Sequence, residues 1–261
     1  MTRLLVIKIG GNVVDNPDAL DAFLNDLASL EGPCVLVHGG GKIATRLGEQ
    51  LGIASRYIQG RRITDDATID LVTMVYGGLI NKQIVAALQS KGCNAIGLTG
   101  ADANCIPAHK RPVGDIDYGW AGDLDGVDGH LIQSLLKMGL TPVLAPLTHD
   151  GKGHMLNTNA DTIASSVAVA LSWAFNVRLM YCFEKKGVLL DVTREDSVIG
   201  RIDGTIHARL LAEGRLADGI LPKIDNAFEA IGAGVTEVLI GDARDLVRNA
   251  GPDVSGTLIV S

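Results

Sequence analysis

The segment "VLVHGGGKIATRLGEQLGI", residues 35–53, carries the pattern that decides the fold. A short apolar run ends at His38 and three glycines follow. Ile43, Leu47 and Leu51 then recur every four residues, which is the spacing of one helix face. The segment therefore predicts a strand, a glycine turn and a helix in succession.

Three consecutive glycines exceed what a tight turn requires, because one glycine already reaches positive φ without strain. They indicate that something approaches the backbone closely. Bare amides at a helix N-terminus can bind phosphate or carboxylate, which the helix dipole favours. An esterase could use HGGG in an oxyanion hole, but no serine of this sequence stands in the G-x-S-x-G frame that such an enzyme needs. The Walker A and G-x-G-x-x-G motifs are also absent.

Composition narrows the classes of function. The chain has 261 residues, 47% of them hydrophobic, which is enough for one large domain or two lobes. A net charge of −7 without a basic run argues against nucleic acid and anionic membranes as partners. We find neither a basic-then-apolar leader nor an apolar run long enough to cross a bilayer. Cys34, Cys93, Cys105 and Cys182 are scattered and expected to be reduced, so a cytoplasmic location is predicted.

Apolar strands alternate with amphipathic helices along the chain, which predicts an α/β fold: a three-layer αβα sandwich around a mostly parallel sheet. Besides the opening segment, strands are predicted at residues 3–9, 94–100, 141–147, 177–183, 237–240 and 257–260. Helices are predicted at residues 18–30, 66–91, 131–139, 205–214 and 222–234, and after 157–161. Residues 101–130, rich in Gly, Asp and Pro, predict a flap or hairpin over the site.

Two lysines point to an anion site beyond the carboxyl ends of the strands, where such sheets bind ligands. Lys8 lies inside an apolar strand, where lysine is rarely buried without a partner. Pro222 suits the first position of a helix, which puts Lys223 in the first turn, where a cation opposes the helix dipole. Taken alone, each lysine would be interpreted as a surface side chain whose stem lies along apolar residues. Together with the glycine turns after both strands, they predict a site for a polyanion.

The whole chain resembles the amino acid kinase family. The resemblance is carried in order by "VIKIGGN", "VLVHGGGK", "GRRITD", "NKQIVAAL", "MLNTNADTIA", "GILPKIDNAFEAIGAGV" and "GTLIV". Carbamate kinase, uridylate kinase and aspartokinase share the scaffold, but "HGGGK", "GRRITD" and "NTNAD" together resemble the branch that acts on N-acetyl-L-glutamate. This implies one domain over residues 1–261. An N-terminal lobe of about 1–172 would hold the acyl-glutamate, and a C-terminal lobe of about 173–261 would hold ATP.

The reaction implied by the resemblance is phosphoryl transfer from ATP to the side-chain carboxylate of N-acetyl-L-glutamate, in arginine biosynthesis. That carboxylate is ionised at neutral pH and needs no general base, so the obstacle is repulsion between two anions. Lys8 and Lys223 are expected to stabilise the transition state, and Asp161 to orient both lysines. Magnesium is expected to arrive with ATP, held mainly by phosphate oxygens and water, with no side-chain metal ligand.

The resemblance also implies roles for the glycine turns. Gly10 and Gly11 should offer backbone amides to the phosphates, and Gly40 and Gly41 should bind the substrate. His38 is expected to be structural, a histidine at a strand end that is bonded to backbone. The glycines after residue 38 would thus let amides close on a carboxylate and on the moving phosphoryl group.

Polar side chains complete the expected substrate site. Arg62 should hold the α-carboxylate through a two-pronged guanidinium contact, with Arg61 as its solvated neighbour. Asn157 should bond the substrate, and Asn159 could do so while capping a helix. The chain departs from the branch at "FEKKGV", where Glu184 replaces an aspartate, and no role is assigned to it.

Assembly and regulation follow from the resemblance as well. The family pairs the helix equivalent to residues 66–91 across a twofold axis, and Gly77 and Gly78 would allow close approach, so a homodimer is expected. Relatives inhibited by arginine carry an additional N-terminal helix. The first strand here is predicted from Arg3, so no arginine inhibition is expected.

Alternatives remain for the substrate. N-Succinyl-L-glutamate would require a further cation near the substrate nitrogen, and Lys110 and Arg111 lie beside the expected flap, although solvated loop charges are the simpler interpretation. Another carboxylate or carbamate kinase activity also stays open. A pseudokinase is disfavoured, because Lys8, Asp161 and Lys223 are all present.

Overall fold

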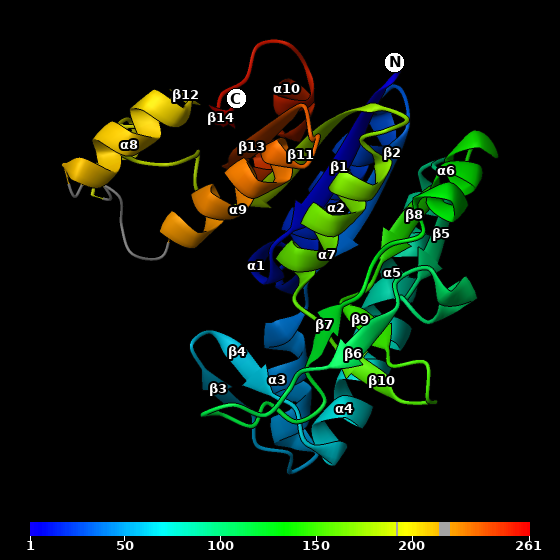
Figure 1. Ribbon diagram of the computed structural model, residues 1–261. Coiled ribbons are helices and arrows are strands. Elements are labelled where there is room, and N and C mark those ends of the chain that lie inside the picture. The colour runs from blue at the N-terminus through cyan, green and yellow to red at the C-terminus, as the bar shows by residue number, and fades with distance from the viewer. Residues whose placement is uncertain (192, 214–219) are drawn as a thin grey trace.

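The computed structural model describes residues 1–191, 193–213 and 220–261. Its centre is an eight-stranded sheet with the strand order β12-β14-β13-β11-β1-β2-β8-β5 (Figure 1). Neighbouring strands pair in parallel except β13 and β14, which are antiparallel. The prediction of a mostly parallel sheet is confirmed.

The sheet strands have the bounds β1 (Arg3–Ile9), β2 (Cys34–His38), β5 (Ala95–Leu98), β8 (Thr141–Leu144), β11 (Asn176–Phe183), β12 (Arg201–Ile202), β13 (Glu237–Asp242) and β14 (Thr257–Ile259). Every residue of β1 after Arg3 is buried. Such a continuous apolar run is what a strand covered on both faces requires. The two-residue strand β12 at the sheet edge was not predicted.

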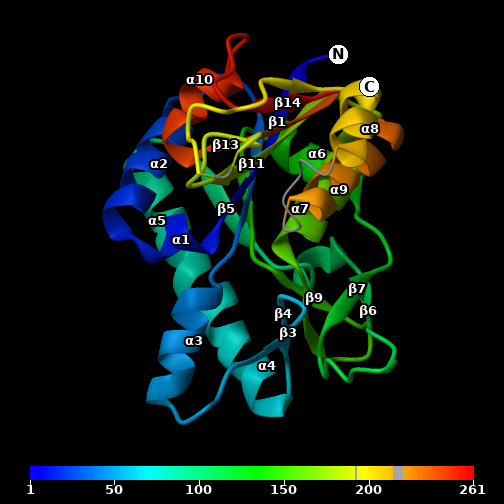
Figure 2. The ribbon, with the colours of Figure 1, turned by 90° about the vertical axis from the view of Figure 1, so that its left-hand side faces the viewer.

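Helices cover both faces of the sheet, which confirms the three layers (Figure 2). One face carries α2 (Pro17–Ser29), α5 (Asn81–Ser90) and α10 (Leu246–Ala250), and the other carries α6 (Gly129–Lys137), α7 (Ala160–Leu171), α8 (Gly204–Ala212) and α9 (Leu221–Gly232). Alternate residues of β1 feed the two cores, with Ile7 in one and Val6 in the other. Gly214, the last residue of the helix predicted at 205–214, lies outside the described residues.

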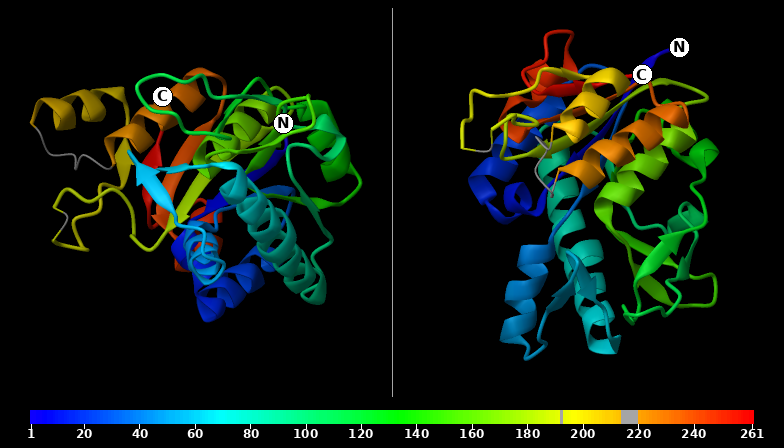
Figure 3. Two further views of the ribbon diagram at one scale, coloured as in Figure 1. Left: turned by 90° about the horizontal axis from the view of Figure 1, so that it is seen from below. Right: turned by 60° about the vertical axis from the view of Figure 1, so that its left-hand side comes forward.

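Smaller elements gather beyond the carboxyl ends of the strands, at the lower end of the molecule in the right-hand view of Figure 3. They are α1 (Gly11–Asp15), α3 (Gly41–Gln50) and the hairpins β3 (Arg56–Ile58) with β4 (Arg61–Ile63), β6 (Ala108–Lys110) with β7 (Gly122–Leu124), and β9 (Leu147–His149) with β10 (Met155–Asn157). Short 3-10 turns cover Asp102–Asn104 and Ala243–Asp245. The β6–β7 hairpin confirms the prediction for residues 101–130.

A single long helix runs from Asp66 to Ser90, as the sequence predicts, and consists of α4 (Asp66–Val72), a π-helical segment (Thr73–Ile80) and α5. By length and composition it could cross a membrane, so the sequence-based statement that no run is long enough was wrong. Its side chains Leu71, Ile80 and Leu88 are buried in the hydrophobic core on the α2 side of the sheet. We therefore interpret it as a core helix.

Candidate active site

Lys8, Asp161 and Lys223 meet where the sheet ends. Lys8 comes from β1, Asp161 from the first turn of α7 and Lys223 from the first turn of α9. Lys8 Nζ lies 2.7 Å from Asp161 Oδ1, and Lys223 Nζ lies 3.2 Å from Asp161 Oδ2. The fold thus joins three residues that are far apart in the sequence.

This lysine–carboxylate cluster has an excess of positive charge in an acidic chain. Lys8 is only 8% exposed. Burial raises the pKa of Asp161, but the charges of Lys8 and Lys223 outweigh burial and hold that pKa below its ordinary value. Both ammonium groups also lie near the Phe183 ring, 5.1 and 4.4 Å from its centre. Two fixed cations that share one carboxylate leave a net positive charge, which favours the binding of a further anion at the cluster.

The two glycine turns lie against each other at the same edge. A Cβ added to Gly39 would lie 3.4 Å from the nitrogen of Gly11, and one on Gly40 would lie 2.4 Å from Ile80 Cδ1. The Gly10 N–H donates to Cys182 O at 3.2 Å, so this amide, which the sequence suggested for phosphate, is already bonded within the protein. Gly11 begins α1, where a helix leaves the N–H without an internal acceptor.

An open pocket of about 210 Å³ adjoins the cluster. The five residues predicted to bind substrate all line it: Gly40, Gly41, Arg62, Asn157 and Asn159. Its wall continues to Ala160, the neighbour of Asp161 in α7. The glycines lie where the chain enters α3, Arg62 lies on β4, and the asparagines lie at the end of β10 and just before α7.

Arg62 is a buried cation whose partners are all neutral within the described part of the chain. It is 6% exposed. Its Nη2 donates to Gly41 O at 2.8 Å and to Thr45 Oγ1 at 3.0 Å, and the guanidinium also donates to Ser55 Oγ and Tyr57 OH. A buried charge without a counter-ion is costly. An anionic ligand in the pocket would supply that counter-ion.

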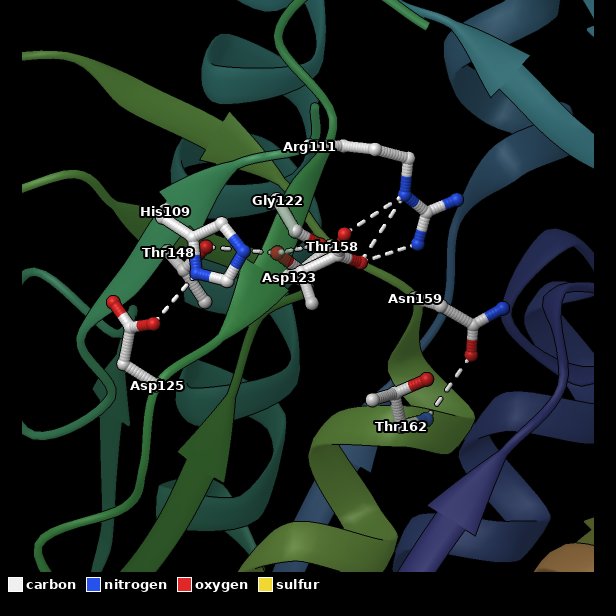
Figure 4. A network of polar contacts seen from close by, with 9 residues as sticks. All are labelled: His109, Arg111, Gly122, Asp123, Asp125, Thr148, Thr158, Asn159 and Thr162. Carbon is white, nitrogen blue, oxygen red and sulfur yellow. Dashed lines mark hydrogen bonds and ion pairs between the residues drawn. The ribbon is translucent and has the colours of Figure 1, made fainter. Parts of the chain in front are cut away.

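The asparagines are held by the fold. Asn159 Oδ1 accepts from the backbone N–H groups of Asp161 at 2.7 Å and Thr162 at 3.1 Å, so Asn159 caps α7 as well as lining the pocket (Figure 4). Asn157 Nδ2 donates to Thr64 Oγ1 at 3.0 Å. Both side chains are therefore fixed before any ligand binds.

Three further pocket residues were not assigned to the site from the sequence. Tyr57 lies on the exposed β3 strand and stacks on Arg62, with 4.7 Å from its ring centre to Arg62 Cζ. Tyr76 comes from the π-helical segment and is 5% exposed. Arg61, predicted to be a solvated neighbour, is exposed but also lines the pocket. The available signal was a tyrosine close to "GRRITD" in a chain with 4% aromatic residues.

The two flap cations have other partners. Arg111 forms a two-pronged ion pair with Asp123 across the β6–β7 hairpin (Figure 4). Lys110 Nζ lies 4.2 Å from the centre of the Trp120 ring. Neither residue lines the pocket.

A second pocket, of about 300 Å³, lies on the C-terminal side of the cluster. Phe183, Glu184, Val188, Lys223 and Ile240 are among its lining residues. Because Lys223 borders this pocket and Ala160 borders the first, the cluster lies between two cavities. The described residues contain no group of three or more His, Cys, Asp or Glu side chains that could hold a metal ion.

The sequence model of the amino acid kinase family matches residues 3–242. The acetylglutamate kinases of Cytophaga hutchinsonii and Bacteroides fragilis are each 56% identical over 249 residues, covering 95% of this chain and 94% and 95% of theirs. That of Methanopyrus kandleri is 36% identical over 250 residues, covering 94% of this chain and 98% of the relative.

Solved structures share the fold of this chain. The N-acetylglutamate synthase from Neisseria gonorrhoeae, complexed with coenzyme A and N-acetyl-glutamate, superposes with a TM-score of 0.81 at 25% identity over 100% of this chain. This chain spans 59% of that synthase chain. Carbamate kinase from Giardia lamblia bound to AMP-PNP has a TM-score of 0.74 at 13% identity, covering 100% of this chain and 98% of the carbamate kinase, which shows the shared fold alone.

Proposed function

The chain belongs to the amino acid kinase family, and from this premise we propose that it transfers the γ-phosphoryl group of ATP to the side-chain carboxylate of N-acetyl-L-glutamate. The products are N-acetyl-L-glutamyl 5-phosphate and ADP, in arginine biosynthesis in the cytoplasm. One observation carries the proposal: two lysines share Asp161 beside a pocket that contains the buried cation Arg62. The relatives named acetylglutamate kinase, at 56% identity, support it.

In the proposed mechanism a carboxylate oxygen of the substrate attacks the γ-phosphorus, and the bond from that phosphorus to the β–γ bridging oxygen breaks. No proton has to move, because the nucleophile is already ionised. Lys8 and Lys223 stabilise the charge on the transferring group, and Asp161 holds both ammonium groups in place. Magnesium brought with ATP supplies positive charge to the phosphates. Its ligands would be mainly phosphate oxygens and water.

We assign each pocket to one substrate. The acyl-glutamate occupies the pocket of the N-terminal lobe, about residues 1–172, with its α-carboxylate on Arg62 and its reacting carboxylate near Gly40 and Gly41. ATP occupies the pocket beside Phe183 and Lys223, in the C-terminal lobe of about residues 173–261. The cluster between the pockets is where the γ-phosphoryl group would be transferred.

The direct test is trapping of the acyl phosphate. With ATP, magnesium and N-acetyl-L-glutamate, the enzyme should release ADP, and hydroxylamine should convert the product into an acyl hydroxamate. Carbamate or free glutamate should give far less product at the same concentration. If N-acetyl-L-glutamate gave ADP without acyl hydroxamate, or if carbamate or free glutamate were the better acceptor, the proposal would be contradicted.

The acyl group can be tested separately. N-Succinyl-L-glutamate remains the second candidate because Arg61, an exposed cation, lines the pocket, whereas Lys110 and Arg111 do not. We expect a higher kcat/KM for N-acetyl-L-glutamate, since no buried cation besides Arg62 faces this pocket among the described residues. A preference for the succinyl compound that is lost in Arg61→Ala but kept in Lys110→Ala/Arg111→Ala would overturn the acetyl assignment and name Arg61 as the selector.

We also propose a homodimer that pairs through the long helix. Met74 and Leu79 of its π-helical segment are 57% and 41% exposed, and a Cβ at Gly78 would meet no atom within 4 Å, so a partner helix could approach closely. Light scattering at micromolar concentration should give twice the chain mass of 27.4 kDa. Met74→Asp/Leu79→Asp should shift the mass to that of one chain, and a monomeric wild type would refute the dimer.

A further inference from the structure

His38 connects the end of β2 to the glycine turn through a defined set of hydrogen bonds. It is fully buried, at 0% exposure. Its Nδ1 lies 2.8 Å from Gly39 O, and because a carbonyl oxygen can only accept, Nδ1 must carry the proton. Nε2 is then an acceptor, and it faces the amide nitrogen of Asn81 at 3.3 Å. One neutral tautomer satisfies both contacts.

Asn81 fixes the other side of the ring. Its amide nitrogen also donates to Val143 O at 2.9 Å, so its orientation is set by a backbone acceptor as well as by His38. Its oxygen accepts from Lys82 Nζ at 3.1 Å. Burial, together with the nearby Lys82 charge, lowers the pKa of His38 to about 4, although the bond to Gly39 acts in the opposite direction. The ring therefore stays neutral near pH 7.

The bond from His38 decides which way the peptide between Gly39 and Gly40 faces. None of the described peptide bonds is cis, and in a trans peptide the C=O and N–H groups point to opposite sides. The C=O of Gly39 is bonded by His38, and the N–H of Gly39 donates to Ile9 O at 3.2 Å. The N–H of Gly40 is consequently turned away from His38. It has no acceptor among the described residues, and both glycines line the first pocket.

A peptide between two glycines needs such a restraint, because neither residue has a Cβ to oppose rotation. If this peptide turned over, the carbonyl oxygen of Gly39 would replace the Gly40 amide in the pocket. A carbonyl oxygen repels a carboxylate, whereas an amide hydrogen attracts it. The same three glycines that allow close approach to a ligand would thus also allow the wrong orientation.

We propose that His38, held in one tautomer by Asn81, is a positioning residue that keeps the Gly40 amide directed at the reacting carboxylate of the substrate. This rests on the proposed kinase function for the identity of the ligand. His38 itself touches neither substrate. It acts on the reaction through Gly39 and Gly40 only.

Two substitutions of similar polarity separate this role from a merely structural one. His38→Asn places an amide nitrogen at the position of Nδ1 and keeps a donor for Gly39 O. His38→Gln places its amide at the position of Nε2 and loses that donor. Since one oriented donor contributes roughly 100-fold to kcat, we expect His38→Gln to lose about 10- to 100-fold in kcat while His38→Asn keeps most of it. KM for ATP should be the same in both variants.

The controls distinguish loss of positioning by His38 from a folding defect and from failure of the proposed kinase function. His130 is exposed on α6, so His130→Gln should match the wild type. Equal losses of kcat in His38→Asn and His38→Gln, with equal drops in melting temperature, would overturn the proposal. In the wild type, ¹⁵N NMR of labelled histidine should show Nδ1 protonated and Nε2 unprotonated, and the opposite tautomer would also overturn it. A wild type that forms no acyl hydroxamate would instead refute the kinase function and leave the tautomer measurement valid.

Discussion

Replacing Lys8 with methionine is expected to lower kcat by roughly 100-fold or more, with little change in KM for either substrate, because a preorganised cation acts mainly on the transition state. Methionine keeps the length and apolar character of the buried stem, so the effect isolates the ammonium group. That group is held 2.7 Å from Asp161 Oδ1 at the end of the buried strand β1. Its orientation is established when the protein folds, before ATP arrives.

Lys223→Met should lose a similar factor, because Lys223 contacts the other oxygen of the same carboxylate. Lys91→Met is the matched control: it removes a lysine that is ion-paired with Asp21 at 2.6 Å and lines neither substrate pocket. Initial rates over both substrate concentrations give kcat and KM for each variant. An unchanged kcat in Lys8→Met or Lys223→Met would remove that lysine from the mechanism.

Arg62→Ala is expected to raise KM for the acyl-glutamate by roughly 10- to 100-fold, in line with about 1.5–3 kcal/mol for hydrogen bonds to a charged group. The contact is made in the ground state and the transition state alike, so kcat should change less. Arg62→Lys should not restore binding, because lysine lacks the planar fork that matches a carboxylate. The prediction depends on a buried guanidinium whose described partners are neutral.

Arg62 also holds parts of the protein together, so its variants need a control. Its guanidinium links Gly41, Thr45 and Tyr57, and Arg62→Ala should lower the melting temperature to some extent. Arg56→Ala, on the exposed partner strand of the same hairpin, should change neither KM nor melting temperature measurably. A rise in KM for ATP without a rise in KM for the acyl-glutamate would show that Arg62 binds ATP and not the acyl-glutamate.

Local patterns predicted the elements that are long and buried. β1, β2 and α3 follow directly from apolar runs and four-residue spacing, and the helix from Asp66 to Ser90 was predicted within one residue of its end. Its π-helical segment was not, because residues 73–80 are almost uniformly apolar and give no period from which a change of winding could be read. The three-residue strands β3 and β4 have no apolar alternating face, since β3 is fully exposed and the buried residue of β4 is Arg62, so no hydrophobic pattern indicated them.

The part of the site that could be predicted from the sequence is the part where an unusual residue type, such as a lysine in an apolar strand, already indicates a function. Lys8 in an apolar strand and Lys223 in the first turn of a helix, where a cation opposes the helix dipole, suggested an anion site. In the structure both lysines contact Asp161. The bonding of the Gly10 amide could not be foreseen, because its acceptor, Cys182 O, is brought near only by the pairing of β1 with β11. Tyr76 likewise enters the pocket only through the packing of the long helix.

The pairing of β1 with β11 limits how the enzyme can move. The two strands belong to different proposed lobes, yet they pair without interruption from Arg3 with Asn176 to Ile9 with Cys182. Parting them would leave buried backbone groups unbonded, at about 1–3 kcal/mol for each group. A hinge that separates the lobes like a clamshell is therefore too costly for a catalytic cycle. We therefore expect substrate entry to use twisting of the intact sheet or displacement of the β3–β4 hairpin, and in either motion Lys8 would stay anchored while the pocket wall moves.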